Sequence, residues 1–245
     1  MMPESTAIII GASGGLGSAL YRRWQRDHKV DHVIAISRQA VAGDVKSRES
    51  STHFIQCDYT ESSIAKACEK IRMLTGSISR VCICNGILHN EHVWPEKRIE
   101  DVNLKHLQEV FTINSIVPML WLKALLTLVK GQSDCVISVF SARIGSIDDN
   151  RSGGWYSYRA SKAALNMLLK TAAIEYARRA KNVKLIAFHP GTTDTALSKP
   201  FQRSVSPDSL FTTEFVAEHL VNIMNNQTVD GELSFIDWEN EAIAW

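Results

Sequence analysis

The sequence predicts an α/β fold, in which a doubly wound parallel sheet of about seven strands carries helices on both faces and forms three layers. Short apolar segments recur along the chain and are separated by longer segments with helical spacing of apolar residues. This β-α-β alternation is typical of such a sheet. A glycine-rich turn directly follows the first apolar segment, which favours a nucleotide-binding sheet. No linker, repeat or low-complexity stretch interrupts the 245 residues, so we expect one domain over residues 1–245.

Seven segments are predicted as strands because most are nearly continuous in apolar or small residues, as in strands covered on both faces. In chain order they are TAIII at 6–10, HVIAIS at 32–37, HFIQC at 53–57, VCIC at 81–84, CVISV at 135–139, KLIAF at 184–188 and LSFI at 233–236. The segments between them repeat apolar residues with the period of a helix. The predicted helices are 15–27, 62–75, 104–128, 158–180 and 213–225.

Two of these helices, 104–128 and 158–180, are apolar or small over most of their circumference. A helix of this kind must be covered on both sides. One side can pack on the sheet, and the other is expected to pack on a second copy of the chain through a two-fold contact. We therefore predict a homodimer or homotetramer. Coverage by the chain's own loops is the alternative.

Net charge and residue composition exclude several classes of protein. The net charge is +1 at pH 7, so we expect neither a nucleic acid nor a membrane as partner. Five cysteines without a Cys-x-x-Cys pair argue against a disulfide framework and against zinc, and the histidines lack metal-ligand spacing, so no metal is expected. The first residues lack the features of a signal peptide, and no uncharged apolar run reaches about 18 residues. The protein is predicted to be cytoplasmic.

The glycine-rich turn joins the first predicted strand to the first predicted helix. Its glycines permit a tight turn and a close approach of the backbone to a pyrophosphate, and the helix N-terminus offers free N–H groups. No Gly-Lys-Ser/Thr follows, which excludes the turn of nucleoside triphosphatases. A glycine-rich turn without a ligand is the alternative. The residues predicted to contact the cofactor here are Gly11, Ser13, Gly14, Gly15, Leu16 and Gly17.

The end of the second predicted strand indicates which dinucleotide binds. An Asp or Glu about 20 residues past the turn would hold the ribose 2′-hydroxyl of NAD. The strand ends instead in Ser37 and Arg38. A guanidinium matches a 2′-phosphate in geometry and in charge. We therefore predict NADP(H), with NAD less favoured. Arg38 as a solvated surface charge is the alternative.

Tyr158 and Lys162 are the candidate proton-transfer pair. Residues four apart share one face of a helix. A nearby positive charge favours the phenolate and lowers the pKa of a tyrosine, which is otherwise near 10 and unsuited to acid–base work at neutral pH. A chance Tyr-x-x-x-Lys is expected in roughly one such chain in four, so the pair alone is weak evidence.

Together these features resemble the short-chain dehydrogenase/reductase family in its compact single-domain form, which has a Rossmann-type fold. The resemblance covers essentially the whole chain, and the order of its motifs makes it specific. Besides the glycine turn, the matching positions are Asp58, Asn85, Gly86, Asn114, Ser141, Tyr158, Lys162 and Pro190-Gly191-Thr192-Thr193-Asp194-Thr195. Residues 141–158 and the final Trp245 also resemble the C-factor-like branch.

The resemblance implies hydride transfer between NADP(H) and a carbonyl or alcohol carbon of a small substrate. It implies that Tyr158 exchanges the proton, that Lys162 binds the nicotinamide ribose and that Ser141 bonds the substrate oxygen. It assigns Asn114 to a water that links the lysine to solvent. The remaining cofactor contacts that it implies are Asp58, Tyr59, Asn85, Gly86, Pro190, Gly191, Thr193 and Thr195.

Several points stay open at the level of sequence. Ser138 is an alternative for the serine, although an extended backbone would turn it to the opposite face from Ser141. Trp155 and Arg143 are candidate substrate contacts from the loop before Tyr158, and residues 196–211, rich in polar residues, are expected to form a lid. A C-factor-like signalling protein that binds nucleotide without turnover is the alternative function. The sequence does not specify the substrate.

Overall fold

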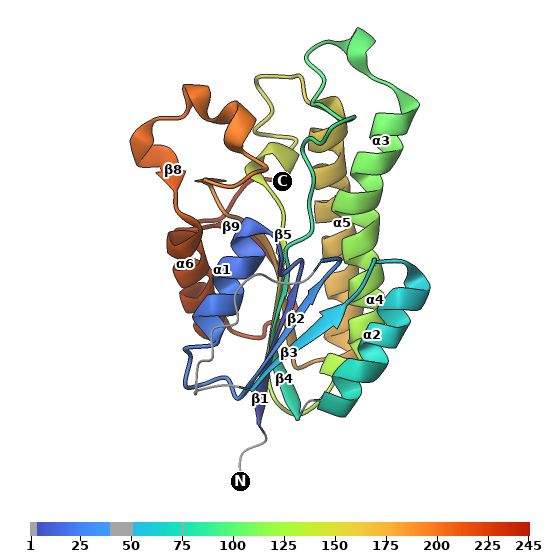
Figure 1. Ribbon diagram of the computed structural model, residues 1–245, viewed down its shortest axis with the longest axis vertical. Helices are drawn as coiled ribbons and strands as arrows, with labels where there is room; N and C mark the ends of the chain where they lie inside the picture. The colour runs from blue at the N-terminus through green and yellow to red at the C-terminus, as the bar shows by residue number, and fades with distance from the viewer. Residues whose placement is uncertain (1–3, 40–50, 75) are drawn as a thin grey trace.

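The computed structural model describes residues 4–39, 51–74 and 76–245. Its main sheet has seven parallel strands in the order β3-β2-β1-β4-β5-β6-β9, which confirms the predicted fold class (Figure 1). β4 begins at Ser77, ahead of the predicted residue 81, and the other strands match their predicted ends more closely. The strands are β1 Ser5–Ile10, β2 His32–Ser37, β3 Ser51–Gln56, β4 Ser77–Ile83, β5 Cys135–Phe140, β6 Val183–His189 and β9 Leu233–Asp237.

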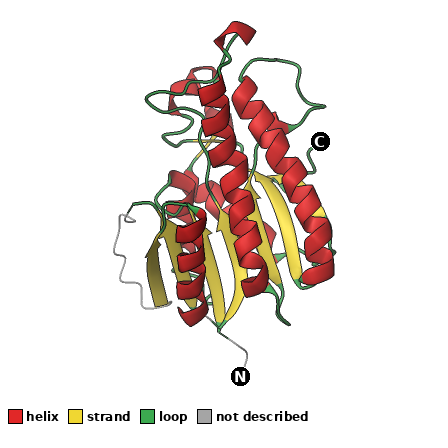
Figure 2. Ribbon diagram, turned by 90° about the vertical axis from the view of Figure 1, so that its right-hand side faces the viewer, coloured by secondary structure: helices red, strands yellow, loops and turns green. Residues whose placement is uncertain are grey.

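Helices cover both faces of the sheet, with α1 and α6 on one side and α2, α4 and α5 on the other (Figures 1 and 2). Consecutive residues of β1 face opposite layers, as a strand requires. Ile8 belongs to the same buried cluster as Leu125 and Leu169, and Ile9 belongs to the other cluster with Leu20 and Leu220. The predicted end of the second helix, Thr75, lies outside the described residues. The helices are α1 Gly15–Trp24, α2 Glu61–Leu74, α3 Leu104–Phe111, α4 Val117–Val129, α5 Tyr156–Arg179 and α6 Thr213–Asn225.

The predicted helix 104–128 differs from the structure, because a π-helical turn at Thr112–Ile116 separates α3 from α4. Pro118 stands in the first turn of α4, and proline lacks the N–H that would continue the hydrogen bonds of an α-helix. The turn is fixed to α5: the Asn114 amide donates to Ser161 Oγ (3.0 Å), and Ser115 Oγ donates to the Ser161 carbonyl (2.7 Å). The irregular turn therefore joins two layers of helix next to the carboxyl end of the sheet.

In the described part of the chain, Leu104–Val129 is the one helical stretch that is long and apolar enough to cross a membrane, judged by length and composition alone. The sequence did not predict it, because Lys123 interrupts the uncharged run. In the structure α4 lies against the sheet between α2 and α5, and 44% of the most apolar window is buried (Figure 1). This position is typical of a core helix that has one side exposed.

The segment after β6 folds into a cap above the carboxyl end of the sheet. Strand β7, Thr192–Thr193, pairs in parallel with β8, Leu210–Phe211. Two 3₁₀ turns, Lys199–Ser204 and Pro207–Ser209, lie between these strands. The predicted lid is thus a folded cap with paired ends rather than an extended loop.

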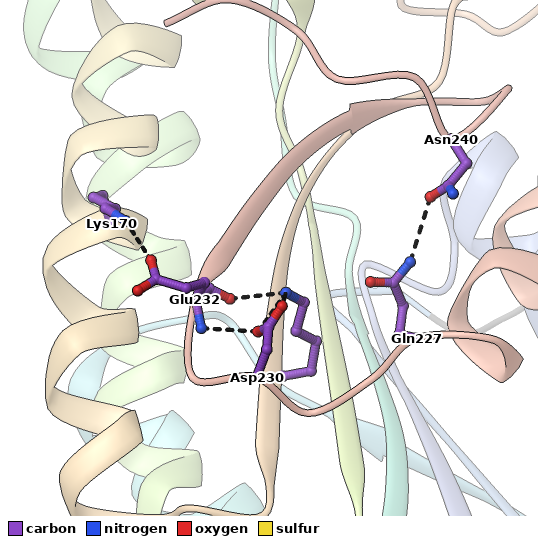
Figure 3. A network of polar contacts seen from close by, with 6 residues as sticks. Lys170, Gln227, Asp230, Glu232 and Asn240 are labelled. Atoms are coloured by element: carbon purple, nitrogen blue, oxygen red, sulfur yellow. Dashed lines mark hydrogen bonds and ion pairs between the residues drawn. The ribbon is translucent and has the colours of Figure 1, made fainter.

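A buried lysine anchors the edge strand β9 (Figure 3). Lys184 of β6 is 1% exposed, and its Nζ donates to both carboxylate oxygens of Asp230 (2.7 Å each) and to the Glu232 carbonyl (3.0 Å). Lys170 of α5 forms an ion pair with the Glu232 carboxylate (2.7 Å). These contacts fix the start of β9, whose far end lies beside the site described below.

Candidate active site

A cavity of about 340 Å³ lies at the carboxyl ends of β4, β5 and β6. In an open α/β sheet this edge is where ligands bind. The cavity gathers side chains from segments that are far apart in the sequence. The predicted residues that line it are Leu16, Asn85, Gly86, Ser141, Tyr158, Lys162, Pro190, Gly191, Thr193 and Thr195.

Tyr158 and Lys162 lie one turn apart on α5 and point into this cavity. Nζ of Lys162 lies 5.8 Å from the centre of the Tyr158 ring and donates a hydrogen bond to the Phe140 carbonyl (2.8 Å). Burial raises the pKa of Tyr158 to about 12 and lowers the pKa of Lys162 to about 8. From the sequence, the ammonium of Lys162 was expected to lower the pKa of the Tyr158 phenol. In the structure this pKa is raised instead, because the loss of water around the phenol outweighs the effect of the charge.

Ser141 directly follows β5 and is held beside the pair. Its N–H donates to the Phe188 carbonyl (2.8 Å), and its hydroxyl donates to Oδ1 of Asn166 (2.5 Å). Ser141 lines the cavity, whereas Ser138 lies within β5 and does not, so the structure favours Ser141 for contact with a ligand. Asn166 was not among the predicted residues. Its position four residues after Lys162, on the same face of α5, was the signal that could have identified it.

Asn114 is fully buried behind the cavity and does not line it. Its Oδ1 accepts from the N–H of Ile87 (2.7 Å), and its amide donates to the Ile87 carbonyl (2.9 Å) as well as to Ser161. The side chain therefore joins the loop after β4 to α5. Oδ1 and Nζ of Lys162 each lie 3.7 Å from the place that a Cβ on Gly86 would occupy, so these two atoms flank that glycine.

The glycine turn has the form that a pyrophosphate requires. Gly11 has a φ of +87°, and a Cβ on Gly17 would lie 2.2 Å from the Gly11 carbonyl oxygen. Neither position tolerates a side chain. Ser13, Gly14 and Gly15 are exposed at the N-terminus of α1, where backbone N–H groups and the helix dipole favour an anion.

The outer end of the predicted cofactor site lies at the ends of β2 and β3. Arg38 is exposed, whereas Ser37 is fully buried and its hydroxyl donates to the Gln39 carbonyl. Asp58 accepts from the N–H of Thr60 (2.9 Å) and from its hydroxyl (2.7 Å), and these bonds lower the pKa of Asp58. Asp58 thus fixes the turn before α2. The proton of the Ser37 hydroxyl is already engaged in a hydrogen bond within the chain.

Tyr59 follows β3, and Asn85 follows β4 and lines the cavity. Tyr59 adopts a φ of +70°, and burial raises the pKa of its phenol. Oδ1 of Asn85 is buried and has no hydrogen-bond partner within the described residues. An unpaired buried acceptor is costly, so it indicates a site for a donor from a ligand. Together with the glycine cradle, this orphaned oxygen fits a dinucleotide.

The loop after β6 borders the same groove. Gly191 has a φ of +68°, and a Cβ there would lie 2.6 Å from the Phe211 ring. Thr193 Oγ1 donates to the Pro190 carbonyl (3.2 Å). The Thr195 methyl group lies 2.9 Å from the place of a Cβ on Gly15, so this loop contacts the phosphate turn directly.

Trp155 occupies the mouth of the cavity, as its place before Tyr158 suggested. It has a φ of +52°, and its N–H donates to the Glu96 carbonyl (2.5 Å). Arg143, the other candidate contact, is bound instead to Asp237 (2.9 Å) and Asp149 (3.5 Å). Of these two described candidates, the tryptophan lines the cavity and the arginine does not.

No sequence pattern pointed to Glu96, which contacts the start of the helix that carries Tyr158. Glu96 is 3% exposed, and its carboxylate accepts from the backbone N–H of Ser157 (3.1 Å) and from the Ser157 hydroxyl. These groups lie in the first turn of α5, so Glu96 caps the helix that carries Tyr158.

His189 also lines the cavity without having been predicted. Its Nδ1 is buried and has no hydrogen-bond partner in the part of the chain that the structure describes. Burial lowers the pKa of this imidazole to about 4, so it is neutral at pH 7. A neutral ring beside Ser141 and Tyr158 adds no charge to the substrate end of the cavity.

Comparison with known proteins agrees with this arrangement. The family model for short chain dehydrogenase matches residues 5–205. Benzil reductase ((S)-benzoin forming) of Bacillus subtilis (strain 168) is 28% identical over 242 residues, which cover 92% of this chain and 96% of that protein. The C-signal protein of Myxococcus xanthus is 26% identical over 145 residues, which cover 59% of this chain and 82% of that protein, in line with the predicted C-factor-like resemblance.

Among solved structures, the NADPH-bound carbonyl reductase from chicken fatty liver has the same fold, with a TM-score of 0.83 at 22% identity and 100% coverage of both chains. The matched family model spans most of the chain and includes the glycine turn, Ser141, Tyr158 and Lys162. The chain therefore belongs to the short-chain dehydrogenase family and is an oxidoreductase.

Proposed function

We propose that the protein transfers a hydride between NADP(H) and the carbonyl or alcohol carbon of a small substrate, with Tyr158 as general acid and base. The observation that carries this proposal is the meeting of Tyr158, Lys162 and Ser141 in one cavity that continues into the glycine turn. Bound NADPH supplies the hydride, and the protein supplies position and a proton.

The raised pKa of Tyr158 suits it to donate in the reductive direction. At about 12, that pKa keeps the hydroxyl protonated at neutral pH, so the proton is present when the carbonyl oxygen gains charge. After the transfer a phenolate remains, and the ammonium of Lys162 stabilises it. The lysine uses one N–H on the Phe140 carbonyl, which leaves two for the ribose hydroxyls of the cofactor.

Ser141 would stabilise the substrate oxygen, provided that its proton is free. In the present arrangement the hydroxyl donates to Oδ1 of Asn166. Rotation of the amide by half a turn presents its NH₂ to the serine oxygen and releases the serine proton toward the substrate. We propose this second orientation as the active one. Asn114, fixed between Ile87 and Ser161, would hold the water that reconnects Lys162 with solvent.

The preference for NADP(H) rests on Arg38 and on the absence of a carboxylate from the β2 end, Ser37-Arg38-Gln39. The NADPH-bound carbonyl reductase from chicken fatty liver supports it by analogy of fold. The test is kcat/KM for NADPH and for NADH with the same carbonyl substrate. A preference for NADH would exclude this assignment.

Replacing Tyr158 with Phe tests the function itself. The ring stays and the hydroxyl goes, so we expect turnover to fall at least about a hundredfold, the usual contribution of a general acid. NADPH binding, measured by fluorescence titration, should stay within a few fold and serves as the control for folding. Wild-type turnover in this variant, on a substrate found in a carbonyl panel, would refute the role of Tyr158.

A second candidate is a signalling protein that binds nucleotide without turnover, which the similarity to the C-signal protein favours. The two functions differ in one measurement. NADPH binding without turnover across a broad panel of carbonyls and alcohols would favour signalling, and turnover of any member would favour the oxidoreductase.

We further propose one domain, a cytoplasmic location and a homodimer or homotetramer. All five cysteines are free, which fits a reducing compartment. Ile116, at the end of the π-helical turn before α4, and Met167 and Ile174 of α5 are exposed, which supports a contact between subunits there.

A further inference from the structure

The end of the cavity beyond Tyr158 and Ser141 is lined by apolar side chains from four separate segments. They are Leu88, Ile144, Trp155, Leu197, Phe201 and Val205. The cap residues that the sequence suggested to be polar thus turn an apolar face inward. Among the described lining residues, Lys162 carries the only charge, since His189 is neutral at pH 7. A charged group on the substrate that lies among these apolar side chains, away from Lys162, would lose its water without gaining a partner.

A second hollow lies on the other side of Trp155 and Phe201, and both residues line both spaces. The centres of these two rings are 5.0 Å apart, and the Trp155 ring lies 6.3 Å from that of Tyr158. Trp94 continues the series 5.9 Å from Phe201, and it is 52% exposed. A chain of aromatic rings therefore leads from the catalytic phenol to the surface. We call the outer part, made of Trp94, Trp155 and Phe201, the aromatic shelf.

The aromatic shelf is held in place rather than loosely exposed. His89 stacks on Trp94 at 5.1 Å, and its Nε2 lies within hydrogen-bond distance of the Ala196 carbonyl (3.1 Å), which ties the loop after β4 to the cap. Glu96 binds the backbone of Trp155, as described above. Lys97, Asp101 and Arg203 bring charges of both signs to the rim of the hollow, so the shelf selects by apolar contact and not by one sign of charge.

From this arrangement we propose a substrate class: an uncharged carbonyl compound, or its alcohol, with an aryl group next to the reacting carbon and a second aromatic group that lies on the aromatic shelf. This inference rests on the proposed function. In reduction the carbonyl carbon accepts the hydride of NADPH, which becomes NADP⁺, and the oxygen accepts the Tyr158 proton. The inner ring fills the apolar end of the cavity, and the outer ring stacks among the three shelf residues.

Matched aldehydes test the class with NADPH. 4-Methoxybenzaldehyde has one ring, 4-benzyloxybenzaldehyde adds the second, and 4-carboxybenzaldehyde places a charge on the first. We expect kcat/KM to be about tenfold higher for the two-ring than for the one-ring compound and at least about tenfold lower for the charged one. In Trp94→Ala the ratio of two-ring to one-ring kcat/KM should fall about tenfold, while Trp94→Phe should keep most of it.

The outcomes separate the two proposals. If the one-ring aldehyde is reduced but the second ring brings no gain, or if Trp94→Ala leaves the ratio unchanged, the substrate class is wrong and the oxidoreductase function stands. Faster turnover of the charged aldehyde would likewise overturn the class. If NADPH binds and no aldehyde, ketone or alcohol in a broad panel turns over, the proposed function fails and this inference fails with it.

Discussion

The buried environment of Lys162 shifts the pKa of its ammonium toward neutral pH. Burial brings its pKa to about 8, so the ammonium is present at pH 7 and is lost above pH 8. Tyr158 stays protonated until about pH 12 and contributes nothing in that window. Because kcat/KM reports groups of the free enzyme, kcat/KM for NADPH should fall above about pH 8, approaching tenfold per pH unit.

The control for this pH profile is Lys162→Met, which has no proton to lose and should give a low, flat profile. The same shift acts on stability. Between about pH 8 and the ordinary lysine value of 10.5, the unfolded chain binds more protons at this residue than the folded chain, so the contribution of Lys162 to the free energy of unfolding rises with pH there. The free energy of unfolding of wild type relative to Lys162→Met should therefore rise over this range. A wild-type profile for NADPH that stays flat to pH 10 would contradict the assignment.

Asn166 offers a second test at the scale of one side chain. Replacing it with Asp keeps the shape but leaves an acceptor that holds the serine proton permanently. We expect kcat to fall about a hundredfold, as when one donor to the developing oxyanion is lost. The double variant with Ser141→Ala should be no slower than Ser141→Ala alone, because both changes remove the same proton.

Asn222→Asp, an exposed asparagine on α6, is the matched control and should retain wild-type turnover. If Asn166→Asp turns over at the wild-type rate, the serine donates independently of the amide and the positioning role is refuted. Full additivity of the two changes would also refute it.

At the scale of elements, the N-terminus of α5 depends on a residue from another loop. Trp155 has no side-chain acceptor, so the carboxylate of Glu96 takes the place of a cap on Ser157. Glu96→Gln replaces one accepting oxygen with a donor and removes a charge that the helix dipole favours. We expect the free energy of unfolding in urea to fall by about 2 kcal/mol.

The control for this change is Glu100→Gln, an exposed residue four positions later. Its unfolding free energy should stay within about 0.5 kcal/mol of wild type. Because the Glu96 carboxylate holds the first turn of the helix that carries Tyr158, kcat/KM should fall in Glu96→Gln while cofactor affinity is kept. Unchanged stability would show that Glu96 contributes no net capping.

The elements that sequence predicted well are those set by local pattern. Most of the seven strands of the main sheet are short runs of apolar or small residues between turns, and such runs are recognised from the local sequence. The π-helical turn at Thr112–Ile116 was missed, since it arises from Pro118 together with bonds to Ser161 on a distant helix. Likewise spacing was enough to place Tyr158 and Lys162 one turn apart on a helix, whereas Glu96 contacts α5 across a long sequence separation that no local pattern encodes.

The raised pKa of the Tyr158 phenol also could not be predicted without the fold. From sequence, the ammonium one turn away was expected to dominate, and only the packed cavity shows that desolvation exceeds it. The same holds for the apolar face of the cap, because Leu197, Phe201 and Val205 are scattered among polar residues in the sequence and converge only when the two 3₁₀ turns form. Chemistry at the carbon–oxygen bond is therefore easier to predict than substrate shape.

At the scale of the whole molecule, the outer side of α4 and α5 has more apolar surface than an isolated chain favours. Met167 is 67% exposed and Ile174 is 47% exposed, and their separation of seven residues places them on one face of α5. Burying such a face in a two-fold contact would remove it from water.

By sedimentation equilibrium we expect a dimer or tetramer of the 27.3 kDa chain at micromolar concentration. Met167→Lys combined with Ile174→Lys should shift the mass to that of one chain, whereas Met73→Lys, on the exposed side of α2, should not. A wild-type mass of one chain would mean that this apolar face stays exposed to solvent, and it would contradict the predicted assembly.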